Sequence, residues 1–321
     1  MLKRFDFARE DEPGAGWLAR FHEGRTETES WYLGNTRPVL PDAGSCRAAL
    51  ALHMPELLGP YDRACAMVGD DAMAHRILSH WRPADDRAGC SQAVWLGAEG
   101  PALVRNYDYP LDLVTGRFEA TCWSGRHVIA KAQRPWGGCI DGMNQDGLVA
   151  SLTFGGTAAR GEGFSVILML RYVLETCTRV DEAAQVLCRI PIATSQNITL
   201  LDAGGAWATL YLGPDRKAAI TRARVCTNHQ ETAGQVVDSV ARQAFIEEAL
   251  TRPDLTLETL AARFLEPPLL SRSAVSTTAY TAIYRPVQGR VDYLWPGETR
   301  TQSFAAFHEG SYSHDYGVLT P

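Results

Sequence analysis

From residue 90 onward, short apolar runs and alternation of apolar with polar side chains predict a series of β-strands. The tight-turn sequences NQDG and AGGAW separate some of these runs. The predicted strands cover residues 90–96, 102–109, 127–133, 137–144, 147–154, 197–203, 207–213 and 218–228, with further strands within 279–297.

Apolar residues at helical spacing predict four helices among these strands, and Pro191 and Pro253 mark where two of them end. The predicted helices cover residues 163–178, 180–190, 236–252 and 254–265. The strands come in hairpins and the helices are grouped, so the pattern predicts an α+β fold with sheets sandwiched between helices. A doubly wound parallel sheet would need a helix after nearly every strand.

Residues 1–89 differ from the rest because they are rich in Arg, Asp and Glu and carry helical patterns over 46–69 and 70–81. Asp71 is expected to cap the second of these helices, and a polar linker follows it. We therefore expect two parts: a helical N-terminal segment, residues 1–89, that packs on the core as a pro-segment or small subunit, and a second domain, residues 90–321.

The charge and composition of the chain limit the kinds of partner that we expect it to bind. The 321-residue chain has a net charge of −6 and a pI of about 5.8, which excludes neither enzymes nor carriers but speaks against nucleic acid and anionic membranes as partners. No long apolar segment interrupts the sequence, so we expect a cytoplasmic protein. The eight cysteines form no CxxC pair and the histidines no HxxxH pattern, so we expect neither a metal nor a cofactor.

The hairpin formed by residues 90–96 and 102–109 carries unusual polar groups at its open end. A three-residue loop, Ala98-Glu99-Gly100, would place Cys90 opposite Asp108. Strict alternation would then put Arg105 on the other face, so a bulge near Asn106 or Tyr107 would be needed to bring both charges to the thiol. Taken alone, Cys90 could equally be a small buried core residue, and Arg105 and Asp108 a surface ion pair.

Four short motifs favour a functional role for Cys90, Arg105 and Asp108 over these structural interpretations, because they occur together and in order. Gly89-Cys90-Ser91-Gln92, followed by RNYD at 105–108, resembles the N-terminal nucleophile (Ntn) hydrolases of the penicillin acyltransferase and choloylglycine hydrolase type. DGMNQDGL at 141–148 is similar to the GxNxxGL strand pair of that group. VCTNHQ at 225–230 and SVAR at 239–242 resemble its TNH strand and its S-x-x-R helix.

The resemblance implies a four-layer αββα sandwich in which residues 90–321 form the catalytic domain and Cys90 becomes the first residue after cleavage of the Gly89–Cys90 bond. The new α-amine, with an ordinary pKa of about 7.7–8.0, would act as general base for the thiol. Asp108 would orient this amine and Arg105 would stabilise the thiolate. The enzyme would cleave a linear, non-peptide N-acyl amide through a thioester, as an amidohydrolase or an acyltransferase.

Three further residues take expected roles from the same resemblance. Asn228 would donate to the oxyanion, and Arg242 would complete the charge network. Thr153 stands where relatives often carry Asn, so the second oxyanion donor there would be a backbone N–H rather than its side chain. Asn144 is interpreted as a turn residue, and Asn197 as a turn cap with support of the site as the alternative.

Two competing hypotheses remain at this stage. A papain-like cysteine hydrolase would use Cys90 with His229 as base, although Cys90 is predicted to begin a strand rather than a helix. A non-catalytic α+β ligand-binding module would leave the chain uncleaved. The expected partners are a small N-acyl amide, with acyl-CoA as an alternative substrate, and the chain's own N-terminal fragment after cleavage; self-association into a homo-oligomer stays open.

Overall fold

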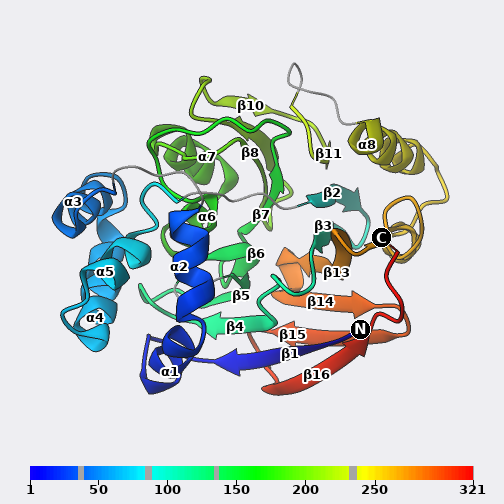
Figure 1. The fold of residues 1–321 in the computed structure, drawn as a ribbon. Helices are drawn as coiled ribbons and strands as arrows, with labels where there is room; N and C mark the ends of the chain where they lie inside the picture. The colour runs from blue at the N-terminus through cyan, green and yellow to red at the C-terminus, as the bar shows by residue number, and fades with distance from the viewer. Residues whose placement is uncertain (35–39, 84–88, 134–136, 231–236, 321) are drawn as a thin grey trace.

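Two β-sheets packed face to face form the centre of the protein in a computed structural model, which describes residues 1–34, 40–83, 89–133, 137–230 and 237–320 (Figure 1). Among these described residues, the larger sheet has nine strands and the smaller has seven. In spatial order, the larger sheet consists of β10 (Ala219–Thr221), β9 (Trp207–Leu212), β8 (Gln196–Leu201), β7 (Val149–Phe154), β6 (Cys139–Asn144), β5 (Val128–Ala132), β4 (Arg117–Thr121), β1 (Leu2–Arg9) and β16 (Gly310–Asp315).

The smaller sheet contains the strands that carry most of the expected site. Its order is β11 (Val225–Cys226), β2 (Gly89–Gly97), β3 (Gly100–Tyr109), β13 (Ser276–Arg285), β14 (Arg290–Trp295) and β15 (Glu298–Ser303), with β12 (Arg272–Ser273) paired to β13. Strand β2 packs across the sandwich on β7, and β3 on β8. The site residues of β2 and β3 therefore lie at or next to the interface between the two sheets.

Helices cover both outer faces. Helices α6 (Val166–Thr176) and α7 (Val180–Arg189) pack on the larger sheet, whereas α8 (Val237–Leu250) and α9 (Leu257–Phe264) pack on the smaller one. This arrangement confirms the αββα sandwich. None of the helices in the described ranges is long and apolar enough to cross a membrane.

The segment before Gly89 contains helices, as expected. They are α1 (Ala15–Glu23), α2 (Arg25–Leu33), α3 (Ala43–His53), the short 3₁₀ helix η1 (Pro55–Leu57), α4 (Leu58–Val68) and α5 (Ala72–Ser79); a second 3₁₀ turn, η2 (Pro286–Gln288), joins β13 to β14. Asp71 caps α5 by accepting from the Ala74 N–H at 2.9 Å. In Figure 1, α3, α4 and α5 lie at the left edge, beside the larger sheet.

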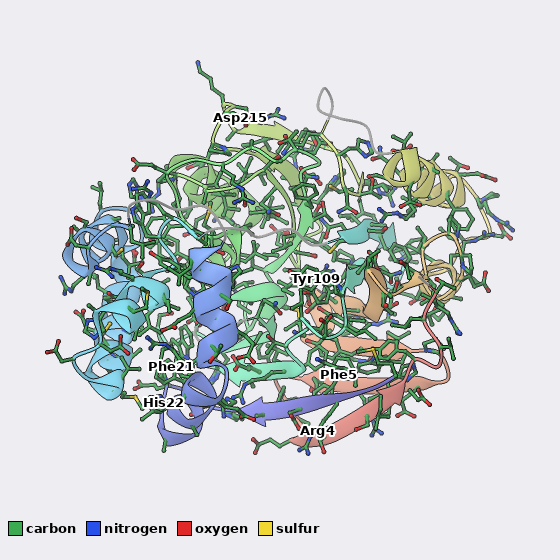
Figure 2. The ribbon with its side chains drawn as sticks, viewed as in Figure 1. Arg4, Phe5, Phe21, His22, Tyr109 and Asp215 are labelled. Atoms are coloured by element: carbon green, nitrogen blue, oxygen red, sulfur yellow. The ribbon has the colours of Figure 1, made fainter. Side chains whose placement is uncertain are left out.

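The description of residues 1–89 as helical is incomplete, because β1 is an interior strand of the larger sheet. It pairs in parallel with β4 and antiparallel with β16. Its Phe5 is fully buried, and the Phe5 ring centroid lies 5.0 Å from that of Trp295 on β14 of the other sheet. Figure 2 labels Phe5 on this strand. The N-terminal segment thus contributes to the central core as well as to the periphery.

Candidate active site

The hairpin of β2 and β3 has a two-residue loop, so the expected three-residue loop is wrong. Gly100 has φ +96° and pairs directly with Gly97, which makes it part of the ladder instead of the turn. The register consequently moves by one residue: Cys90 lies opposite Tyr107, and Asp108 lies opposite Gly89.

This register removes the need for a bulge between β2 and β3. Arg105 is two residues from Tyr107, so its side chain emerges on the same face as Cys90, while Asp108 emerges on the other face. The pairing of β2 with β3 is regular throughout; the irregularity in this sheet lies on β13, between Thr278 and Tyr280. The two charges therefore approach Cys90 from opposite sides of one sheet.

The Cys90 sulfur lies in a fully buried position at the interface of the sheets. Burial raises the pKa of its thiol to about 12, and the Arg105 guanidinium opposes that rise. Nη2 of Arg105 lies 2.6 Å from Sγ, within donating distance. In the uncleaved chain the thiol is therefore neutral near pH 7, with a cation held against it.

The main chain of Cys90 is held on the other side of the sheet by Asn228 and Arg242. The Cys90 N–H donates to Oδ1 of Asn228 at 3.1 Å, and Nη2 of Arg242 donates to the same oxygen at 2.8 Å. Nη1 of Arg242 donates to the Cys90 carbonyl oxygen at 3.0 Å and to Oγ of Ser91 at 2.5 Å. The structure thus brings both sequence-predicted residues to the peptide group at Cys90.

Asp108 is buried beside Gly89 and contacts polar groups of other elements. Its Oδ1 accepts from the Thr278 hydroxyl at 2.7 Å, and its Oδ2 lies 3.8 Å from Nη1 of Arg242. Burial raises the pKa of Asp108, while Arg242 and Thr278 act in the opposite direction. Asp108 therefore lies on the face of β3 opposite to the Cys90 sulfur, paired with Gly89 and near Arg242.

The Thr153 side chain is committed to structural hydrogen bonds. Its hydroxyl donates to the Thr227 carbonyl at 2.7 Å and accepts from Nδ2 of Asn197 at 3.1 Å. Asn197 also donates to the carbonyls of Thr227 and His229, both at 3.1 Å. Asn197 therefore supports the segment after β11 that carries Asn228, and its interpretation as a turn cap is wrong.

Asn144 and His229 have clear structural partners. Asn144 accepts from the Asp146 and Leu148 N–H groups, which confirms that it is a turn residue. His229 places Nδ1 2.8 Å from Oγ of Ser239 on α8, and burial lowers its pKa. Since Cys90 lies on a strand and its sulfur faces Arg105, this geometry does not favour the papain-like pair.

Sequence reasoning missed a buried polar group behind Arg105, namely Asp141 on β6 with Tyr280 and Tyr284 on β13. Asp141 accepts hydrogen bonds from Arg105 and from both tyrosines. A charged residue inside a predicted core strand was the available signal. Within the described ranges, no group of three or more His, Cys, Asp or Glu side chains could hold a metal ion.

The solved structures that resemble this fold include the following three. A variant of conjugated bile acid hydrolase from Clostridium perfringens superposes with a TM-score of 0.50 at 11% identity, over 72% of this chain and 99% of that one, which shows a shared fold. Penicillin V acylase from Agrobacterium tumefaciens gives 0.48 at 15% identity, over 67% and 86%. A Caenorhabditis elegans ortholog of N-acylethanolamine-hydrolyzing acid amidase gives 0.48 at 14% identity, over 72% and 100%.

The sequence comparison is more specific. No curated protein matches the chain in sequence. The model of one family, described as acyl-coenzyme A:6-aminopenicillanic acid acyl-transferase, matches residues 95–300, more than half of the chain. The match begins downstream of Cys90, so it covers Arg105, Asp108, Asn228 and Arg242 but not the cysteine itself. The chain therefore belongs to the acyl-coenzyme A:6-aminopenicillanic acid acyl-transferase family, and it is an Ntn hydrolase-type enzyme, a hydrolase acting on amides or an acyltransferase.

Proposed function

We propose that the chain cleaves itself at Gly89–Cys90 and then acts through the Cys90 thiolate on a linear N-acyl amide. The observation that carries this proposal is that both the sulfur and the main-chain nitrogen of Cys90 have polar side-chain partners. Its sulfur lies 2.6 Å from a buried guanidinium, and its nitrogen lies 3.1 Å from the Asn228 side chain. A cysteine that only filled the core would need no buried cation at its sulfur.

Self-cleavage begins with attack of Sγ on the carbonyl carbon of Gly89. The C–N bond breaks, the nitrogen becomes the α-amine of Cys90 and takes the thiol proton, and Gly89 is left as a thioester. Water then hydrolyses the thioester, which yields the Gly89 carboxylate and the free thiol. Asp108 lies beside Gly89 and Arg242 binds the Cys90 carbonyl, so both support the main chain on either side of the bond.

The same groups serve the substrate reaction. The α-amine removes the thiol proton, and Sγ attacks the substrate carbonyl to form a tetrahedral intermediate. The oxygen of Asn228 is fixed by Cys90 and Arg242, so its NH₂ end is the one that donates to the oxyanion; such a donor contributes about 3–4 kcal/mol. The amine leaves with the proton held by the α-amine, and a thioester remains on Cys90.

The acceptor decides between hydrolase and transferase. Water gives the free acid, and an amine gives a new amide, with the α-amine taking the acceptor's proton in either case. Acyl-CoA is the alternative acyl donor, in which a thiolate leaves instead of an amine. The N-terminal fragment stays bound after cleavage, since β1 is held between β4 and β16.

Intact-mass analysis tests the self-cleavage. Wild type should give pieces of 89 and 232 residues (321 less 89), whereas Cys90→Ala should remain one chain of 35.2 kDa. Cys139→Ala is the matched control, because Cys139 is equally buried and burial likewise raises its pKa to about 12, yet it lies on β6. This variant should be cleaved like wild type.

A substrate panel tests the second step. It contains penicillin V, a conjugated bile acid, an N-acylethanolamine and an acyl-CoA offered with an amine acceptor, and it is read out by mass spectrometry of the products. At least one N-acyl bond should be turned over by wild type and not by Cys90→Ala. A wild-type chain that stays intact, with Cys90 no more reactive to iodoacetamide than Cys139, would exclude the proposal and favour the non-catalytic module.

A further inference from the structure

A fully buried group of charged and hydroxyl side chains lies between the two sheets, directly behind Arg105. Asp141 on β6 is its centre and has no exposed surface. Oδ2 of Asp141 accepts from Nη1 of Arg105 and from the Tyr280 hydroxyl, the latter at 2.5 Å. Oδ1 accepts from the Tyr284 hydroxyl. Both carboxylate oxygens are therefore engaged, and three residues of the opposite sheet meet on one acid.

Arg105 uses its guanidinium as a bridge. Nη1 contacts Asp141, while Nη2 contacts the Cys90 sulfur at 2.6 Å and the Asn106 carbonyl at 3.2 Å. Its Nε has no hydrogen-bond partner among the described residues. Because a guanidinium is planar and rigid, fixing Nη1 also fixes the direction of Nη2. In the described part of the chain, Asp141 is the only charged group hydrogen-bonded to Arg105.

The two charges act on the thiol with opposite signs. Arg105 lowers the pKa of Cys90, and Asp141 raises it. If Asp141 acted only through its own charge, its removal would lower the thiol pKa. If Asp141 acts by holding the guanidinium in place, its removal lets Arg105 move away from the sulfur, and the thiol pKa rises. The direction of the change therefore separates the two roles.

Other titratable groups face Asp141 from four strands, and they bear on any pH measurement. Lys131 on β5 lies directly across the ladder from Asp141, and burial lowers its pKa to about 7. Tyr280 and Tyr284 on β13 and Tyr293 on β14 are buried, and burial raises their pKa values far above the ordinary one. Cys139, on β6 itself, has a thiol pKa raised to about 12.

We propose that Asp141 is a positioning residue that holds the Arg105 guanidinium against the Cys90 sulfur, with Tyr280 and Tyr284 fixing the carboxylate. This role rests on the function proposed for Cys90. The two polar residues of the DGMN motif then have different functions. Asn144 shapes the turn, and Asp141 binds Arg105 across the sandwich and acts on the nucleophile through it.

The test is the pH dependence of Cys90 alkylation by iodoacetamide in the processed protein, followed by peptide mass spectrometry. In Asp141→Asn the apparent pKa of Cys90 should rise, the alkylation rate at pH 7.5 should fall at least tenfold, and kcat should fall with little change in KM. Glu175→Gln is the matched control, because Glu175 is also buried and paired with a buried arginine, Arg171, at 3.5 Å on α6. In Glu175→Gln, the alkylation rate of Cys90 should stay within twofold of the wild-type rate at each pH.

Each outcome decides the matter. An unchanged or lowered Cys90 pKa in folded Asp141→Asn overturns the positioning role. A folded Asp141→Asn chain that stays uncleaved while Glu175→Gln is cleaved supports it, since self-cleavage needs the same contact. If Asp141→Asn does not fold, Tyr280→Phe replaces it, because Tyr280 and Arg105 both donate to Oδ2 of Asp141. A fall of at least twofold in the Cys90 alkylation rate at pH 7.5 supports the positioning role, and an unchanged rate overturns it. Wild-type Cys90 that does not react at all counts against the proposed function instead.

Discussion

The protonated side chain of Lys131 should destabilise the folded protein below neutral pH, and this destabilisation should disappear at alkaline pH. Its side chain is fully buried on β5, where the ammonium donates to the Ala132 carbonyl at 2.7 Å and lies 5.7 Å from the centre of the Tyr107 ring. Burial lowers its pKa from 10.5 to about 7, with Asp141 partly opposing this effect. The free energy of unfolding must therefore depend on the protonation of this one residue.

The magnitude follows from the two pKa values. Their difference, at about 1.4 kcal/mol per pH unit, corresponds to about 5 kcal/mol below pH 7. Between pH 7 and 10.5 the unfolded chain binds one more proton than the folded chain, so wild-type stability rises with pH across this window. Lys131→Met removes this dependence and also a hydrogen bond, whose loss costs about 1–2 kcal/mol. The variant should be more stable by about 3 kcal/mol at pH 6 and no more stable than wild type at pH 10.

Urea unfolding from pH 6 to pH 10 measures this difference. The Cys90→Ala background keeps the protein in one chain, and comparing two chains that differ only at residue 131 cancels the other titrations. Lys217→Met is the control, since Lys217 is exposed on the loop after β9; its effect should be small at every pH. A Lys131→Met effect that is the same at pH 6 and pH 10, or a loss of stability at pH 6, would refute this reasoning.

Two further substitutions test the roles of Thr153 and Phe5. Thr153→Val should lower stability by about 1–3 kcal/mol in urea unfolding and leave kcat within about threefold, because the hydroxyl proton is already donated to the Thr227 carbonyl; a hundredfold loss of kcat would mean that the hydroxyl acts on substrate. Phe5→Ala should weaken the cleaved complex by about 3–5 kcal/mol, so that the small fragment separates on gel filtration after dilution. Leu2→Ala, at a side chain 69% exposed on the same strand, should not release it.

The layering and most core elements could be predicted from the sequence because their apolar patterns are strong. Helix α6 is one example: its predicted span, 163–178, encloses Val166–Thr176. The polar residues inside it could not be interpreted, since Arg171 and Glu175 are both buried and pair with each other. Sequence patterns report burial of apolar groups, whereas a buried ion pair depends on which partner the fold brings within reach.

Strand register and contacts between residues far apart in the chain could not be predicted from the sequence. Gly100 fits either a three-residue loop or the first ladder position of a two-residue loop, and this one-residue difference decides which face Arg105 shares with Cys90. Strand β1 escaped prediction because its alternation of Phe5 and Phe7 with charged residues is short, and its neighbours β4 and β16 lie far along the chain. Asp141 was missed for the same reason: its partners belong to β3 and β13.

The first residue of the described chain lies beside residues close to its other end, and this has a consequence for how the nucleophile can be generated. The Met1 amino group donates to the Gly317 carbonyl at 2.6 Å and lies 3.2 Å from Oδ1 of Asp315. A short linker could join these ends without disturbing β1 or β16, and the chain could then be opened between Gly89 and Cys90. Such a circular permutant would carry Cys90 directly behind its initiator methionine. Removal of that methionine by an aminopeptidase would expose the α-amine without attack of the Cys90 thiol on its own chain, which separates the chemistry of the proposed maturation from the chemistry of turnover in a single polypeptide.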